Sequence, residues 1–229
     1  DDPTVIGADL HNEPYNGVWG GGGANDWAAA AERAGNAIGD VNPNWLIFVE
    51  GVGSHQGQPY WWGGNLMGVR DRPVELDVVN KLVYSPHDYP NSVYAQPWFQ
   101  GPDFPANLPA KFDQMWGYIY KQNIAPVWIG EFGTKLVDPK DAPWLEAITS
   151  YLSGDFDNNG TVGFSYTNFV WLTGGGILQF GHVGMGFIAS FQNYELGVPG
   201  QAVPLGWRRV AMPRQRHLLP VAAQHPGLV

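Results

Sequence analysis

The chain of 229 residues contains no cysteine and no long apolar run, and only 14% of its residues are charged. Without cysteine, disulfide bonds, cysteine-ligated zinc sites and thiol nucleophiles are excluded. No apolar segment approaches the roughly 18 residues that a membrane-spanning helix needs, so no membrane partner is expected. With 44% hydrophobic residues, the composition argues against disorder and predicts one well-packed core.

Basic residues are also scarce, because 12 Lys and Arg stand against 21 Asp and Glu and give a formal net charge of −9. A field of this sign repels the phosphates of nucleic acids and the head groups of anionic lipids. We therefore expect no nucleic acid partner, and an uncharged ligand fits the charge better.

Aromatic residues, in contrast, are abundant. The 11 Trp and 10 Tyr exceed what a core of this size needs. Aromatic faces stack well on the C–H faces of sugar rings, for the same reasons of burial and dispersion that make them good interface anchors. The excess indicates a carbohydrate ligand, although any single tryptophan can equally belong to the core.

Short apolar runs alternate with longer amphipathic segments, the pattern of parallel β-strands joined by crossover helices. We predict five strands, three fewer than a closed (β/α) barrel needs, at residues 5–10, 45–49, 81–85, 125–130 and 162–171. Asp26 is the expected N-cap of the first helix, and the predicted helices cover residues 27–38, 109–122 and 142–152.

We divide the chain into a catalytic domain at residues 1–180 and an atypical tail at residues 181–229. The tail holds four arginines against a single acid, and its hydrophobic periodicity fades, so a disordered or foreign segment is preferred to a functional basic module. At the other end, Asp1-Asp2-Pro3 leads at once into a strand with no signal peptide, which suggests a cut.

Two carboxylates directly follow apolar strands. Glu13 lies in His-Asn-Glu-Pro after the first strand, and Glu131 lies in Gly-Glu-Phe-Gly after the fourth. Active sites of parallel α/β barrels lie at the carboxyl ends of the strands, so both side chains are expected at one mouth. Either one alone could be a structural carboxylate. Together they form the pair that glycosidic cleavage requires, in which one group protonates the leaving oxygen and the other attacks from about 5 Å.

Further candidates surround this mouth. His87 and Tyr89 follow the third strand, where an imidazole and a phenol can orient an ionised carboxylate. The loop at residues 51–72 is too rich in aromatics and glycine for a plain connector, and we interpret it as a binding wall with Trp61 and Trp62. Trp171 ends the fifth strand and is a candidate stacking platform, with a core position as its alternative.

These stretches resemble glycoside hydrolase family 5, especially its bacterial endo-β-1,4-glucanases. The resemblance reaches to about residue 178 and rests on residues 5–14, 44–51, 60–66, 84–89 and 125–133. It implies an α/β fold of the TIM (β/α)8 barrel type, here a truncated barrel covering strands 4 to 8. The missing strands would carry an arginine and a histidine of the pocket, and an incomplete barrel predicts poor stability or association.

The same resemblance implies a retaining, secreted endo-β-1,4-glucanase that cleaves internal bonds of cellulose or related β-glucans. By that resemblance Glu13 is the acid/base and Glu131 the nucleophile, while Asn12 binds the sugar 2-hydroxyl. His87 and Tyr89 support the nucleophile. The expected substrate-binding residues are Asn12, His11, His87, Tyr89, Trp171, Trp61 and Trp62. The polysaccharide is the expected partner, and no cofactor, metal or obligate protein partner is inferred.

Several alternatives stay open. A catalytically inactive glucan-binding fragment would keep the aromatic residues but lack turnover, and a β-mannanase, xyloglucanase or β-1,3-glucanase would use the same paired glutamates. Glu50 is a third carboxylate at a strand end, interpreted as a structural hydrogen-bonding residue. Residues 155–160 fit the first half of a calcium loop, but the twelfth position is Tyr166 instead of glutamate, so a polar turn is favoured.

Overall fold

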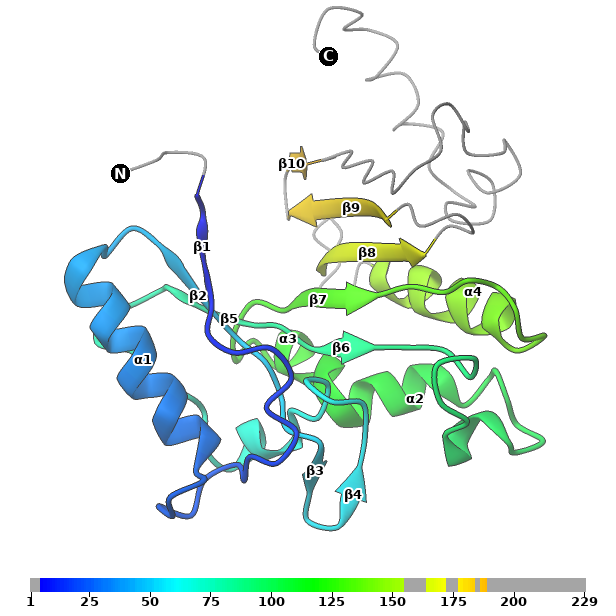
Figure 1. The fold of residues 1–229 in the computed structure, drawn as a ribbon, viewed down its shortest axis with the longest axis horizontal. Coiled ribbons are helices and arrows are strands. Elements are labelled where there is room, and N and C mark those ends of the chain that lie inside the picture. The colour runs from blue at the N-terminus through cyan, green and yellow to red at the C-terminus, as the bar shows by residue number, and fades with distance from the viewer. Residues whose placement is uncertain (1–4, 155–163, 172–176, 184–185, 189–229) are drawn as a thin grey trace, which may run out of the picture.

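The structure is a computed structural model that describes residues 5–154, 164–171, 177–183 and 186–188, with side chains up to residue 154 and at Phe164. Its centre is a row of parallel strands (Figure 1). These strands are β1 (Gly7–Asp9), β2 (Leu46–Val49), β5 (Leu82–Tyr84), β6 (His87–Asp88), β7 (Trp128–Phe132) and β8 (Ser165–Trp171). All five predicted strands are confirmed; the third corresponds to β5, and β6 is a further short strand beyond its predicted end.

The parallel strands follow one another in chain order, first as β1-β2-β5 and then as β6-β7-β8. Only Ser85 and Pro86 separate β5 from β6, and a parallel bridge from Tyr84 to Val127 joins the two sheets. The result is one arc in which every crossover leads to the neighbouring strand, as in a (β/α) barrel. Beyond it, β9 (Ile177–Val183) and β10 (Gly186–Ile188) continue the sheet in antiparallel order.

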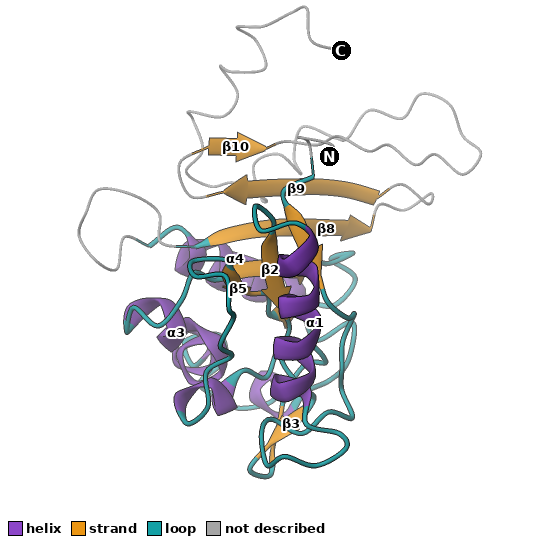
Figure 2. Cartoon of the chain, turned by 90° about the vertical axis from the view of Figure 1, so that its left-hand side faces the viewer, coloured by secondary structure: helices purple, strands orange, loops and turns teal. Residues whose placement is uncertain are grey.

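In the described part of the chain, the longer helical segments lie along the arc (Figure 2). Helix α1 spans Trp27–Val41, and the side chain of Asp26 caps it by accepting a hydrogen bond from the backbone N–H of Ala29, as predicted. Helix α4 spans Asp141–Leu152, close to its predicted bounds. The helix predicted at 109–122 consists of three consecutive pieces, namely α2 (Leu108–Phe112), a π-helical turn (Asp113–Gly117) and α3 (Tyr118–Lys121).

The long loop at residues 51–72 is folded back on the end of β2. It contains the hairpin of β3 (Ser54–His55) and β4 (Gln58–Pro59) and a 3-10 helix at Met67–Arg70. Bridges from Gly51 to Gly63 and from Val52 to Asn65 hold it in place. A second 3-10 helix lies at Pro97–Phe99. The loop therefore has a defined structure and forms part of the face at the carboxyl ends of the strands, as a binding wall requires.

The core lies between the strands and the helices α2 to α4. Trp116, Phe112, Tyr151 and Phe164 pack their rings edge to face or stacked, with centroids 5.3 to 5.7 Å apart. Such packing gives Trp116 and Tyr151 a place in the core instead of a role in ligand binding. Within the described ranges, no helix is long and apolar enough to cross a lipid bilayer.

Strand β1 is the outermost strand of the arc. In the part of the chain that the structure describes, it pairs with β2 alone, and Val5 and Ile6 before it are 40% and 45% exposed. The expected poor stability or association of an incomplete barrel stays a prediction. The domain boundary at residue 180 falls within β9 and also stays a prediction, while residues 155–160 and 189–229 lie outside the described residues.

Candidate active site

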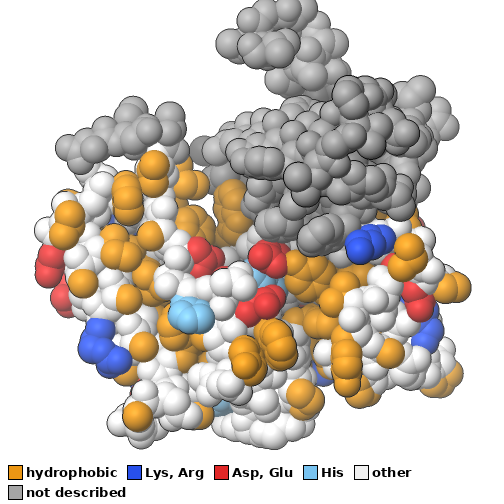
Figure 3. Space-filling view, viewed as in Figure 1, with side chains coloured by type: hydrophobic (Ala, Val, Ile, Leu, Met, Phe, Trp, Pro, Cys, Tyr) orange, Lys and Arg blue, Asp and Glu red, His pale blue; other side chains and the backbone are white. Residues whose placement is uncertain are grey.

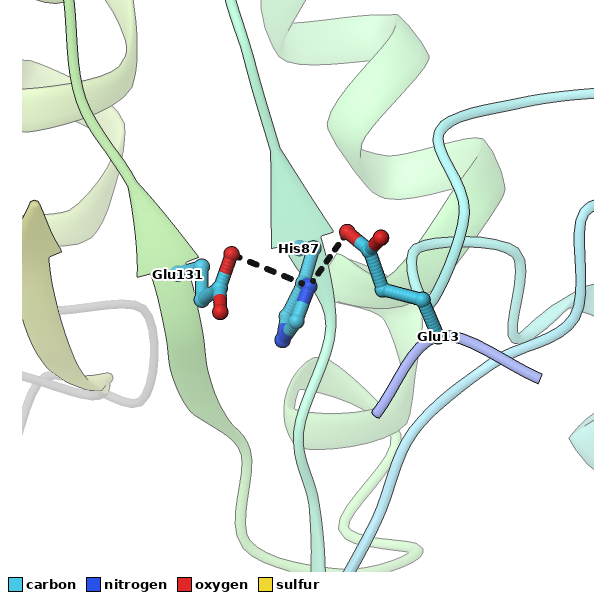
Figure 4. A group of neighbouring side chains, drawn as sticks. All are labelled: Glu13, His87 and Glu131. Carbon is cyan, nitrogen blue, oxygen red and sulfur yellow. Dashed lines mark hydrogen bonds and ion pairs between the residues drawn. The ribbon is translucent and has the colours of Figure 1, made fainter. Parts of the chain in front are cut away.

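The candidate site lies at the carboxyl ends of β1, β6 and β7. Glu13 follows β1 in a loop, whereas His87 begins β6 and Glu131 lies near the end of β7. The parallel register pairs His87 directly with Glu131, so the two side chains leave neighbouring strands on the same side. Figure 4 shows His87 between the two glutamates, each of which points toward its imidazole ring.

The two glutamates meet across a small gap. One carboxylate oxygen of Glu13, one of Glu131 and one ring nitrogen of His87 all lie within 4.8 Å of one another. Nδ1 of His87 is 3.0 Å from Oε1 of Glu13 and 3.5 Å from Oε2 of Glu131. This gap is near the separation of about 5 Å for a retaining glycosidase and well short of the 6.5 Å or more of an inverting one.

Access to the pair is also suitable for a reaction on a bound ligand. The side chains of Glu13 and Glu131 are 24% and 26% exposed, whereas that of His87 is 2% exposed. Acidic side chains gather beside a histidine near the middle of the molecular face in Figure 3. The two carboxylates can therefore contact a substrate, while the buried imidazole contacts both of them from the interior of the protein.

Tyr89 acts on Glu131 directly, because its phenol donates a hydrogen bond to Oε2 of that carboxylate. Burial and the neighbouring Glu131 charge raise the pKa of Tyr89 above its usual value. The phenol consequently stays protonated at neutral pH and remains a donor. It holds one oxygen of Glu131 and leaves the other available.

The imidazole of His87 is surrounded by carboxylates. Burial by itself would lower the pKa of His87, but the hydrogen bond to Glu13 and the charges of Glu50 and Glu131 outweigh it and raise the pKa. A raised pKa favours the charged imidazolium, which neutralises part of the negative charge collected here. His87 thus allows two glutamates to lie close together.

Asp88 follows His87 in β6, and its side chain faces the side of the strand opposite to that of His87. Asp88 is buried and accepts hydrogen bonds from the hydroxyl of Tyr60 and, at 2.9 Å, from Nε1 of Trp144. Burial raises the pKa of Asp88 to about 7. Sequence reasoning did not assign a role to this residue. Its two donors anchor β6 from behind, so that His87 and Tyr89 on either side of it face the mouth.

Glu50, which the sequence suggested as a structural hydrogen-bonding residue, does make such a bond. It is 2% exposed at the end of β2, and its Oε2 accepts a 2.7 Å hydrogen bond from the backbone N–H of Glu13. Its Oε1 lies 3.4 Å from Nε2 of His87. The position after an apolar strand was visible in the sequence, but the two contacts depend on how the strands are arranged.

The aromatic residues near the mouth divide into two groups. Trp61 is only 6% exposed and packs against Tyr89 and Trp98, whereas Trp62 is 54% exposed and stacks on Tyr15 with centroids 4.3 Å apart. Tyr15 was not among the predicted site residues, although it follows the His-Asn-Glu-Pro motif. An exposed stacked pair beside Glu13 is suited to contact a sugar ring.

A groove of about 350 Å³ adjoins Glu13 on the side of helix α1. His11, whose ring meets that of Trp27 edge-on, lies in its lining together with Glu13 and Tyr15. Asn12 is exposed beside them. The side chain of Trp171, at the end of β8, lies outside the described residues. Direct contacts therefore join Glu13 and Glu131 to His87 and Tyr89, while His11 lines the groove beside Glu13.

A metal ion could be accommodated geometrically, since Glu13, His87 and Glu131 offer one nitrogen and two oxygens within 4.8 Å. Attack by one carboxylate and proton transfer by another nevertheless require no metal. The absence of a metal and of a cofactor stays a prediction.

Comparison with known proteins identifies related sequences. A family model described as cellulase, glycosyl hydrolase family 5, matches residues 1–171. An endoglucanase of Paenibacillus polymyxa is 59% identical over 160 residues, which cover 67% of this chain and 40% of that protein. The major extracellular endoglucanase of Xanthomonas campestris is 36% identical over 166 residues, covering 69% of this chain. The chain thus spans 40% and 34% of the lengths of these two relatives.

Solved structures show the same relationship. A complex of an endocellulase from Pyrococcus horikoshii with cellotetraose is 41% identical, has a TM-score of 0.64, and is matched over 73% of this chain and 49% of that one. The catalytic domain of the Xanthomonas campestris enzyme is 37% identical with a TM-score of 0.62, over 66% of this chain and 45% of that one. Together with the arc of parallel strands, these neighbours establish a fold of the TIM barrel type.

Proposed function

The chain belongs to glycosyl hydrolase family 5, the cellulase family, and from this membership we propose that it is part of a retaining endo-β-1,4-glucanase acting on cellulose or related β-glucans. The observation that carries the proposal is the distance of no more than 4.8 Å between carboxylate oxygens of Glu13 and Glu131. This distance suits direct attack by a carboxylate and leaves too little room for the water that an inverting enzyme places between them.

In the proposed first step, an oxygen of Glu131 attacks the anomeric carbon while Glu13 donates its proton to the glycosidic oxygen. The bond to the leaving sugar breaks, and a glycosyl ester on Glu131 forms. In the second step Glu13, now ionised, takes a proton from water, and the resulting hydroxide oxygen attacks the same carbon and releases Glu131. Tyr89 holds the nucleophile in both steps through its hydrogen bond to Oε2.

The surrounding residues are proposed to bind the polysaccharide. We assign Asn12 to the 2-hydroxyl of the sugar at the reacting centre, and Trp171 to the face of that ring. His11, Trp62 and Tyr15 border the side of Glu13 from which the leaving sugars depart. Trp61, which is almost fully buried, is proposed to contact sugar only through its edge and otherwise to support Tyr89.

The choice of substrate is supported by the relatives. Two of them bear the name endoglucanase, and a structural neighbour is an endocellulase bound to cellotetraose. The open groove beside Glu13 is compatible with an internal stretch of a polymer. An extracellular site of action is proposed on the same basis, because one relative is named the major extracellular endoglucanase.

We further propose that β1, β2, β5 with β6, β7 and β8 are strands 4 to 8 of an eight-stranded barrel. Two facts support this numbering. The parallel strands are consecutive neighbours, and the chain matches slightly under half of the solved relatives. The exposed residues before β1 would then face strand 3.

Hydrolysis of carboxymethylcellulose and of a chromogenic cellobioside tests the proposal. We expect Glu131→Gln and Glu13→Gln to lower kcat by about 10³-fold or more, since each removes one reacting group. Glu146→Gln, which changes an exposed glutamate on α4, serves as the matched control. A 2-deoxy-2-fluoro cellobioside should label Glu131. A label on Glu50, or binding of cellohexaose without any product from the unmodified chain, would contradict the assignment and favour a binding protein.

A further inference from the structure

Glu50 is a deeply buried carboxylate beside the proposed catalytic pair, and the proposed reaction gives it no role. It lies between the proposed catalytic groups and the interior at the end of β2, with 2% of its surface exposed. A buried acid is normally stabilised by hydrogen-bond donors or by groups of opposite charge. The side chain of Glu50 contacts the backbone N–H of Glu13, the imidazole of His87 and the carboxyl group of Asp9.

The contact with Glu13 concerns the main chain. Glu13 has a φ angle of 48°, in the left-handed region that residues with a side chain rarely adopt. Its backbone N–H points inward and donates to Oε2 of Glu50 at 2.7 Å. A buried N–H without an acceptor would be unfavourable, so the carboxyl group of Glu50 stabilises the backbone conformation from which the Glu13 side chain reaches the site.

The contact with His87 concerns the imidazole. Oε1 of Glu50 is 3.4 Å from Nε2, while Nδ1 on the opposite side of the ring is 3.0 Å from Oε1 of Glu13. The ring is therefore held between the two glutamates. Gly63 packs directly against Glu50 and His87, because a Cβ atom at this position would lie 2.5 Å from Oε2 of Glu50 and 3.2 Å from Cγ of His87. A side chain at position 63 would therefore collide with Glu50.

We propose that Glu50 is a positioning residue, whose carboxyl group holds both the main chain of Glu13 and the imidazole of His87 and so maintains the separation of Glu13 from Glu131. The structural part of this inference stands on the contacts themselves. Its effect on turnover rests on the proposed function.

The ionisation of Glu50 is coupled to its surroundings. The charged groups that act on it are Asp9 from β1, His87 from β6 and Glu131 from β7, and Glu13 acts on it through its backbone N–H. Burial raises the pKa of Glu50 to about 8, His87 opposes this, and Asp9 and Glu131 add to it. In either ionisation state Glu50 retains an oxygen that can accept a hydrogen bond from the N–H of Glu13, so this hydrogen bond persists below and above the pKa of Glu50.

Nuclear magnetic resonance of the complete chain tests the structural part without requiring turnover. In the unmodified chain, the Glu13 amide proton should be shifted downfield and should titrate with Glu50. In Glu50→Gln the amide should stay hydrogen-bonded but lose this titration, and the pKa of His87 should fall because a charge next to Nε2 is gone. In Glu50→Ala the downfield shift itself should disappear. Glu146→Gln, at an exposed position, should change none of these signals.

Turnover supplies a second, separate readout. We expect Glu50→Ala to lower kcat about 10- to 100-fold, the effect of leaving the backbone N–H of Glu13 without its acceptor. Glu50→Gln should restore part of this loss and should shift the pH profile, which a merely structural residue would not do. If the unmodified chain is inactive, the proposed function of this chain fails while the spectroscopic test still decides the role of Glu50.

Two results would overturn the inference. One is a Glu13 amide signal in the unmodified chain with neither a downfield shift nor a titration, a measurement that needs no variant to fold. The other is a folded Glu50→Ala variant with an unchanged His87 titration and, where the chain is active, an unchanged kcat and pH profile.

Discussion

Individual side chains at the site act through few, well-defined contacts. Tyr89 donates to one oxygen of Glu131, and His87 contacts Glu13 and Glu131 through the same ring nitrogen. The exposed fractions of the two glutamates, 24% and 26%, show that these contacts leave one face of each open. The supporting residues therefore restrict the reacting groups without covering them.

Replacing Tyr89 by phenylalanine should separate support from substrate binding. The variant loses only the hydroxyl that donates to Glu131, so we expect kcat to fall about 10- to 100-fold with little change in KM. Steady-state rates on a chromogenic cellobioside measure both quantities. Tyr94→Phe removes a hydroxyl from a residue that is 66% exposed and should leave both unchanged. An unaltered kcat in the Tyr89 variant would mean that this hydrogen bond does not assist the nucleophile.

Secondary-structure elements carry these residues to a common edge. The register of β6 with β7 places His87 beside Glu131. Helix α1 contributes through its first residue, because Nε1 of Trp27 donates to the backbone oxygen of Glu50 at 2.8 Å. The start of α1 is in turn held by Asp26, whose carboxylate accepts from the N–H groups of Gly20, Gly22 and Ala29. The cap thus connects the helix to the loop that follows Glu13.

Removal of this cap should destabilise the chain measurably. For Asp26→Ala we expect the free energy of unfolding to fall by about 1–2 kcal/mol, since three backbone N–H groups lose their acceptor. Urea denaturation followed by circular dichroism gives this value. Asp26→Asn retains an acceptor oxygen and should recover most of the loss. Equal stability of the alanine variant and the unmodified chain would show that the cap is unimportant.

For the molecule as a whole, the buried acids set how stability depends on pH. The pKa values of Asp88 and Glu50 are raised by burial to about 7 and about 8. An acid with a raised pKa in the folded state binds more protons there than in the unfolded chain. The folded state therefore loses stability as the pH rises from the pKa of the unfolded chain to that of the folded state. The chain should therefore be more stable at pH 5 than at pH 8.

Asp88→Asn is the variant that checks this dependence. Between pH 4 and pH 7 the ionisation of Asp88 should cost on the order of 1–4 kcal/mol in the folded state, and asparagine removes that cost while keeping an acceptor for Nε1 of Trp144. Unfolding free energies from urea titrations at several pH values should give a flatter profile for the variant. A profile parallel to that of the unmodified chain would show that Asp88 is not responsible.

The sequence by itself determined the local features of this protein. Apolar runs indicated five of the six parallel strands, the Asp26 cap marked the start of α1, and Glu13 and Glu131 stood out because they follow or end strands. Such features depend on residues close together in the chain. Periodicity, capping and strand ends can therefore be read without coordinates.

Only the tertiary structure decided what meets across the site. The sequence did not show that Glu50 binds the main chain of Glu13, nor that Trp61 is buried while its neighbour Trp62 is exposed. The parallel register of His87 with Glu131 and the 4.8 Å limit on the carboxylate gap likewise arise from strand pairing. Contacts between distant residues depend on register, on loop paths and on what fills the core, and these are settled only when the whole chain packs together.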